Sequence, residues 1–254
     1  EALKWGTHAR TIAIGYQAMY DTNAGSTSMG SDDNIFIGYQ AGGGTWANVA
    51  SIQNVVIGNN SADAALSGAN YNVGMGTNVY GALTQGDANS AFGHGSLTAL
   101  TTGGSNVAVG NGAGATMTGT SNTTLIGYLA GTAINSTDAD GTVAVGYQAL
   151  QDLTSGQNSV AVGYRALADL TTGDYNTAVG YGALDAITTG LDNTALGWGA
   201  GGSTSNTTGA NNVALGLCAL KSSVSANENI AIGTRTLLTN TTGAANVGMG
   251  YRSL

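Results

Sequence analysis

A short motif of alternating large and small residues closed by glycine recurs along this chain, most often as Asn-Val-Ala-Val-Gly. Most closing glycines follow one another at intervals of 17 residues, with intervals of 18 to 23 near the start and two of 19 later. A fixed period of this length is typical of a solenoid, in which each repeat packs on its neighbours. The fourteen closing glycines are Gly15, Gly38, Gly58, Gly76, Gly93, Gly110, Gly127, Gly146, Gly163, Gly180, Gly197, Gly216, Gly233 and Gly250.

Composition excludes several classes of protein. The 254 residues include 42 glycines and no proline, and the glycines do not follow a Gly-X-Y register, which excludes collagen. The 42% of hydrophobic residues argues against simple disorder. Net charge is −8 and the six cationic side chains are scattered, so we expect no binding to nucleic acid or anionic membrane. No apolar run is long enough for a membrane helix, so no membrane insertion is expected. The single cysteine, Cys218, forms no intrachain disulfide and is expected to be a small buried residue.

Each motif predicts one short strand. The residues one and three places before the closing glycine are mostly large and aliphatic, as Val160 and Val162 are, and a small residue such as Ala161 lies between them. This alternation predicts a strand of four or five residues. We expect the large residues to face the core. The small residues would then form an outward Ala/Gly stripe along which identical chains pack closely.

Asparagine, threonine or serine precedes every strand. Side chains of this kind form turns, and stacked asparagines can also form a hydrogen-bonded ladder. After the glycine come two apolar residues spaced by three, such as Leu167 and Leu170, and then a second glycine-marked bend. The repeat therefore predicts a coil with two sides. The ten asparagines are Asn34, Asn54, Asn72, Asn89, Asn106, Asn176, Asn193, Asn212, Asn229 and Asn246.

The motifs resemble two groups of fibrous proteins. Asn-Ser-Val-Ala-Val-Gly at 158–163 and Asn-Ile-Ala-Ile-Gly at 229–233 are similar to head repeats of trimeric autotransporter adhesins of the YadA type. The longer form at 176–190, from Asn-Thr-Ala-Val-Gly to Thr-Thr-Gly, resembles repeats in bacteriophage tail fibres. The resemblance implies a left-handed parallel β-roll that assembles as a homotrimer. The 17-residue period is longer than the usual adhesin repeat and favours the phage-like variant.

Taken together, the chain is predicted to be all-β, a left-handed parallel β-roll of about 14 rungs in one repeat domain over residues 1–254. Longer, irregular rungs are expected at 1–76 and regular ones at 77–254. The start at Glu1 resembles neither a signal peptide nor an initiator methionine, and Leu254 falls inside a repeat, so we expect a segment of a longer chain.

No residue cluster predicts catalysis or metal binding. His8 and His94 have no cysteine or carboxylate partners at ligand spacing, and the Asp138-Ala-Asp140 stretch lacks the later carboxylate of a calcium loop. Asp32 and Asp33 are interpreted, like these aspartates, as solvated turn residues. We therefore expect no catalytic, cofactor-binding or metal-binding residues and no cofactor.

An aromatic residue follows the closing glycine in eight copies. We expect these rings to lie in register along one edge of the roll, where covering the turn is favoured over binding sugars. They are Tyr16, Tyr39, Tyr128, Tyr147, Tyr164, Tyr181, Trp198 and Tyr251.

The functional expectation is a non-enzymatic extracellular fibre segment, foremost part of a bacteriophage tail fibre involved in host attachment. A bacterial adhesin head, located on the cell surface, is the alternative. A polysaccharide-degrading tail spike, with carboxylates assembled between chains, is the second alternative. The expected partners are two identical chains and a host-surface glycan or protein receptor.

Overall fold

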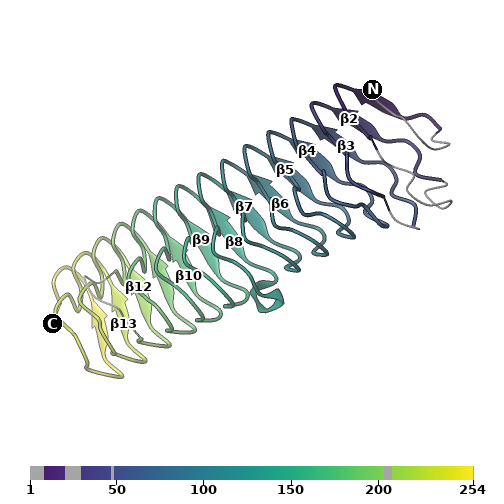
Figure 1. Ribbon diagram of the computed structural model, residues 1–254. Coiled ribbons are helices and arrows are strands. Elements are labelled where there is room, and N and C mark those ends of the chain that lie inside the picture. Colours follow the sequence, from purple (N-terminus) through teal and green to yellow (C-terminus); the bar gives the residue numbers. More distant parts are fainter. Residues whose placement is uncertain (1–8, 21–29, 47–48, 203–207, 254) are drawn as a thin grey trace. The chain divides into compact units, whose positions relative to one another are not determined.

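A computed structural model describes residues 9–20, 30–46, 49–202 and 208–253. These residues form two compact units, one reaching to Leu125 and including 135–137, the other comprising 126–134 and the described residues from Asp138 onward. In each unit the chain winds into successive coils that carry one strand each (Figure 1). No helix in the described ranges is long and apolar enough to cross a membrane.

Six strands of the described residues lie wholly in the first unit. Each pairs in parallel with the next, and equivalent residues face one another, as Ala91 of β5 faces Ala108 of β6. The strands are β1 (Ile12–Ile14), β2 (Ile35–Ile37), β3 (Val55–Ile57), β4 (Val73–Met75), β5 (Ser90–Phe92) and β6 (Val107–Val109). A further strand, β7 (Thr124–Ile126), spans the point where the two units divide.

The second unit repeats this arrangement with seven strands and the same parallel register. They are β8 (Val143–Val145), β9 (Val160–Val162), β10 (Thr177–Val179), β11 (Thr194–Leu196), β12 (Val213–Leu215), β13 (Ile230–Ile232) and β14 (Val247–Met249). A short 3-10 helix, η1 (Thr137–Ala139), lies before β8. The predicted all-β parallel solenoid is therefore confirmed, with strands of three residues. The left-handed sense of the coil stays a prediction.

The closing glycine is required because neighbouring coils approach very closely there. Gly163 has a φ of 138°, and a Cβ added to it would lie 2.3 Å from the carbonyl oxygen of Gly180 in the next coil. Both the backbone conformation and the space therefore exclude a side chain. The same close approach recurs from coil to coil, as at Gly146, where an added Cβ would lie 2.2 Å from the Gly163 oxygen.

Residues other than glycine also adopt left-handed conformations. Arg165 and Leu167, two and four places after the closing glycine, have φ values of 53° and 52°. This turns their N–H groups toward opposite neighbours, since Arg165 N donates to Tyr147 O at 2.9 Å and Leu167 N to Ala183 O at 3.0 Å. A left-handed leucine costs about 1–2 kcal/mol. Inter-coil hydrogen bonds and complete burial of Leu167 offset that cost.

The expectation that the large strand residues face the core is wrong. The central residue of each strand from β2 to β14 is buried, while its two neighbours are half-buried or exposed. Ala161 in β9, for example, is 0% exposed. The small residue points inward because the coil is narrow and the predicted apolar pair, Leu167 and Leu170, already fills its interior.

Residue sizes inside the coil are complementary. In β2 the central residue is Phe36, and the position four places after the closing glycine is Gly42, where an added Cβ would lie 2.7 Å from the Phe36 ring. In β4 the sizes are reversed, because the central residue is Gly74 and Tyr80 takes the other position. The interior therefore admits one large side chain at this level, as expected for a close-packed core.

An asparagine ladder runs inside each unit, as the sequence suggested. Asn89 N and Nδ2 both donate to Asn72 Oδ1 at 3.0 Å, and Nδ2 also donates to Gly103 O at 3.0 Å. Its own Oδ1 accepts from Asn106 N and Nδ2 at 3.0 Å. The side chain thus satisfies two backbone groups of the following coil, Gly103 O and Asn106 N, and bonds to the side chain of the asparagine in the preceding coil.

Replacing Asn89 by alanine is predicted to destabilise the protein by about 2–4 kcal/mol, because it leaves buried donors and an acceptor without partners. Asn111→Ala is the matched control, since Asn111 is exposed and should cost little. Denaturant-induced unfolding of both variants measures the difference. Equal losses for the two variants would contradict a structural role for the ladder.

The close approach at the closing glycines is tested by two alanine substitutions in one coil. Gly93→Ala places a Cβ 2.6 Å from Gly110 O and should cost more than about 3 kcal/mol. Gly95→Ala meets nothing within 4 Å at a φ of 65° and should cost only about 1–2 kcal/mol. Denaturant-induced unfolding measures both, and a Gly93→Ala variant as stable as Gly95→Ala would show that the contact is unimportant.

Candidate functional site

The residues on either side of each central strand residue form an outward aliphatic face in each unit. In the second unit it includes Leu196, which is 53% exposed, and Ile230, Val247 and Met249. Because the strands pair in register, equivalent side chains repeat about every 4.8 Å along the sheet. The outer stripe therefore consists of large apolar side chains, and the predicted Ala/Gly stripe is wrong since those residues are buried.

Five aromatic residues of the second unit form a continuous aromatic ladder. Ring centroids of successive members lie 5.3, 5.0, 4.8 and 6.1 Å apart, and neighbouring planes are within 12° of parallel. The predicted register is thus confirmed here, and at Tyr16 and Tyr39 of the first unit, whose rings stack at 5.6 Å. The aromatic ladder consists of Tyr128, Tyr147, Tyr164, Tyr181 and Trp198.

Two aspartates in the coils that carry Tyr164 and Tyr181 have raised pKa values. Partial burial disfavours the charged form and raises the pKa of Asp185, and the nearby Asp169 carboxylate adds to the effect. Partial burial also raises the pKa of Asp169, against the opposing effect of Arg165, whose Nη2 lies 3.3 Å from Asp169 Oδ1. No pattern in the sequence predicts this pair, because Arg165 and Asp169 lie in a turn, where the four-residue spacing that brings side chains together on a helix does not apply.

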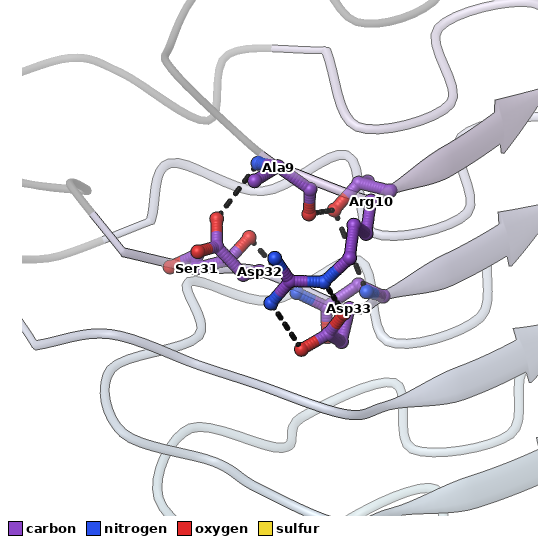
Figure 2. A network of polar contacts seen from close by, with 7 residues as sticks. Ala9, Arg10, Ser31, Asp32 and Asp33 are labelled. Carbon is purple, nitrogen blue, oxygen red and sulfur yellow. Dashed lines mark hydrogen bonds and ion pairs between the residues drawn. The ribbon is translucent and has the colours of Figure 1, made fainter.

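A polar network links the first coils of the first unit (Figure 2). Arg10 Nε and Nη2 donate to the two carboxylate oxygens of Asp33 at 2.5 and 2.9 Å, and Ala9 N donates to Asp32 Oδ1 at 2.7 Å. The Arg10 hydrogen bond holds the pKa of Asp33 below its ordinary value. The interpretation of these two aspartates as merely solvated turn residues is therefore incomplete, since both connect neighbouring coils.

The other residues weighed for chemistry are not brought together. His8 lies outside the described residues, and His94 is exposed. Asp138 lies in η1 and Asp140 follows it. Within the described part of the chain, no three His, Cys, Asp or Glu side chains gather as a metal site. Cys218 is buried and forms no disulfide, so its interpretation as a small buried residue is confirmed.

Comparison of this chain with protein-family models, with curated proteins and with solved structures finds no match.

The two kinds of aspartate predict opposite responses to pH. The folded pKa of Asp169 is raised above its unfolded value, so its charged form lowers the stability of the fold at pH 7. This destabilisation is lost as pH falls from the folded pKa to the unfolded pKa. Asp169→Asn should therefore stabilise the protein at pH 7 and lose this advantage in acid. The folded pKa of Asp33 is lowered, so its stabilisation is present above its unfolded pKa of about 3.9 and lost as pH falls through the folded pKa.

Asp33→Asn is accordingly predicted to destabilise the protein at pH 7 and to have little effect in strong acid. Denaturation midpoints of both variants and the parent chain, measured from pH 7 down to pH 2, give the comparison. Effects of the same sign at pH 7 would contradict the opposite environments of these two carboxylates.

Proposed function

We propose that this chain is a segment of a homotrimeric, non-enzymatic extracellular fibre, specifically a bacteriophage tail fibre that takes part in host attachment. The observation that carries the proposal is the outward aliphatic face. Large exposed apolar patches on proteins commonly mark surfaces that bind a partner. Here such side chains recur strand after strand in each unit, so covering them requires an equally long partner.

A second copy of the same chain fits that requirement. Its outward aliphatic face has the same spacing of about 4.8 Å between strands, so rows of side chains from two copies can interdigitate over many coils. Closed point-group symmetry is the common way in which identical chains bury such surfaces. The number three comes from the resemblance of the repeats to trimeric fibres. An adhesin head would use the same assembly, and the 17-residue period favours the tail fibre.

The proposal of a structural role agrees with the chemistry of the described residues. Hydrolysis of a glycoside commonly needs two carboxyl groups placed across the substrate, one to donate a proton and one to act on the sugar. The carboxylates of Asp169 and Asp185 influence one another, and Asp169 is paired with Arg165. A carboxylate held by an arginine is not free to act on a sugar. We therefore propose attachment without cleavage.

The assembly is tested by the mass of the native particle in solution. The parent chain is expected to be a trimer, whereas Leu196→Lys should dissociate it at least tenfold more readily, because three lysines would be buried in an apolar contact. Leu217→Lys is the control, since Leu217 is 43% exposed but lies outside the outward aliphatic face. Native mass spectrometry and sedimentation at several concentrations distinguish these results, and a monomeric parent chain would overturn the proposal.

Attachment is examined with the same protein by measuring its binding to bacterial cells while assaying released sugar. Binding without release of sugar agrees with the proposal. Release of sugar from the cell surface would instead favour a polysaccharide-degrading spike.

A further inference from the structure

A surface hollow of about 170 Å³ lies at the Trp198 end of the aromatic ladder. Tyr181 and Trp198 line it together with Asp185 and Lys221. The two rings lie 6.1 Å apart, the widest spacing in the ladder, and are 53% and 48% exposed. The hollow therefore combines two accessible aromatic rings with one anionic and one cationic group.

Two glycines create this hollow. Gly182 and Gly199, each two places after a closing glycine, belong to its lining. The two preceding coils carry Gln148 and Arg165 at this position, with φ values of 53° that nearly match the 59° of both glycines. The backbone thus accepts a long side chain at this position. In these two neighbouring coils that side chain is missing, and the space beside the rings stays open.

Covering a turn does not require such a hollow. Tyr147 and Tyr164 stack at 5.0 Å and fulfil that role. In the coils of these two tyrosines, the position two places after the closing glycine holds Gln148 and Arg165. The two side chains contact one another, because Arg165 Nη1 donates to Gln148 Oε1 at 3.4 Å. The Trp198 end differs in ring spacing, in its glycine pair and in its charged groups. A structural role for the ladder therefore leaves this end unexplained.

The lining matches the two-sided chemistry of a sugar ring. A pyranose has an apolar face of C–H groups that packs on an aromatic ring, and hydroxyl groups at its edge that need donors and acceptors. Trp198 offers the apolar surface, Asp185 accepts hydrogen bonds and Lys221 donates them. Lys221 Nζ lies over the Trp198 ring, 5.0 Å from its centre, and Tyr181 stacks against the same ring, so a sugar meets the exposed edges of the two rings beside the ammonium group.

The volume of the hollow and the charges around it further restrict the class of sugar that it can bind. The hollow is smaller than the roughly 300–1,000 Å³ of pockets for drug-sized ligands, so it has room for about one sugar ring. Asp185 and Lys221 offset one another, as the nearby Asp169 and Arg165 do. These four groups therefore carry no net positive charge that would attract the carboxylate of an acidic sugar such as a uronic or sialic acid.

We propose that this hollow binds one neutral hexopyranose unit of a cell-surface polysaccharide, with its C–H groups against the exposed ring edges of Tyr181 and Trp198 and its hydroxyls bonded to Asp185 and Lys221. This inference rests on the proposed function, because it supplies the receptor contact of an attachment fibre. The polysaccharide chain leaves the hollow through its open side. Identical copies in a trimer would present three such sites and strengthen binding to a repeated glycan.

The test uses the full chain and two kinds of probe. Methyl glycosides of glucose, galactose and mannose are titrated by saturation-transfer NMR, and neutral polysaccharides such as dextran and mannan by calorimetry. Gly199→Gln places in the hollow the side chain that the fold already carries at the equivalent position, Gln148. Trp198→Leu replaces the indole by leucine, the residue that the next coil carries at this position as Leu217. Both variants are expected to bind at least roughly tenfold more weakly while keeping the parent circular dichroism, and Gly199→Gln should lower the denaturation midpoint only as much as the Gly95→Gln control does.

Gly95→Gln is the matched control. Gly95 occupies the same position two places after a closing glycine, has a φ of 65° and meets nothing within 4 Å, but it belongs to the first unit and is not among the residues that line this hollow. Its sugar binding should equal that of the parent chain. A Gly95→Gln variant that loses binding as strongly as Gly199→Gln would overturn the assignment of the site.

Other results overturn the inference and leave the fibre proposal standing. These are a trimeric parent chain that binds none of the neutral sugars, one that prefers uronic or sialic acids, and a Gly199→Gln variant that binds sugars and cells as the parent does. A monomeric parent chain that still loses neutral-sugar binding in Gly199→Gln and Trp198→Leu would have the reverse meaning. It would support the site and overturn the trimeric fibre.

Discussion

The close stacking of one coil on the next at the closing glycines is the constraint on which the rest of the structure depends. At Gly163 the backbone of the following coil occupies the space that any Cβ would need. This proximity keeps equivalent residues of neighbouring coils at hydrogen-bonding distance. The parallel register of the strands, the asparagine ladder and the stacked aromatic rings all follow, since each needs the same position to recur directly above itself.

The narrow interior is the second determinant, and it decides what the protein shows to solvent. With Leu167 and Leu170 filling the coil, only a small residue such as Ala161 fits at the centre of the strand. Large aliphatic side chains are therefore displaced to the outside, where a monomer gains little from them. Their exposure links the packing of a single coil to the proposed assembly of identical chains, because association removes that apolar surface from water.

The candidate site was only partly predictable from the sequence. The aromatic register followed from the period, but the hollow beside Trp198 required knowing that the second position after the closing glycine lies next to the rings. Gly182 and Gly199 were visible as an interruption of longer side chains at that position. The contacts of Arg10 with Asp33 and of Arg165 with Asp169 were not predictable, because they depend on left-handed turn conformations that no simple pattern encodes.

The sequence by itself determined the period, the one strand per repeat, the parallel stacking and the ladders, because a regular repeat can satisfy its backbone only by placing like on like. Only the tertiary structure decided which face of the strand points inward. Alternation with period two distinguishes two faces without saying which is buried. The answer depends on the left-handed residue four places after the glycine, whose size complements the strand centre in Phe36 with Gly42 and in Gly74 with Tyr80.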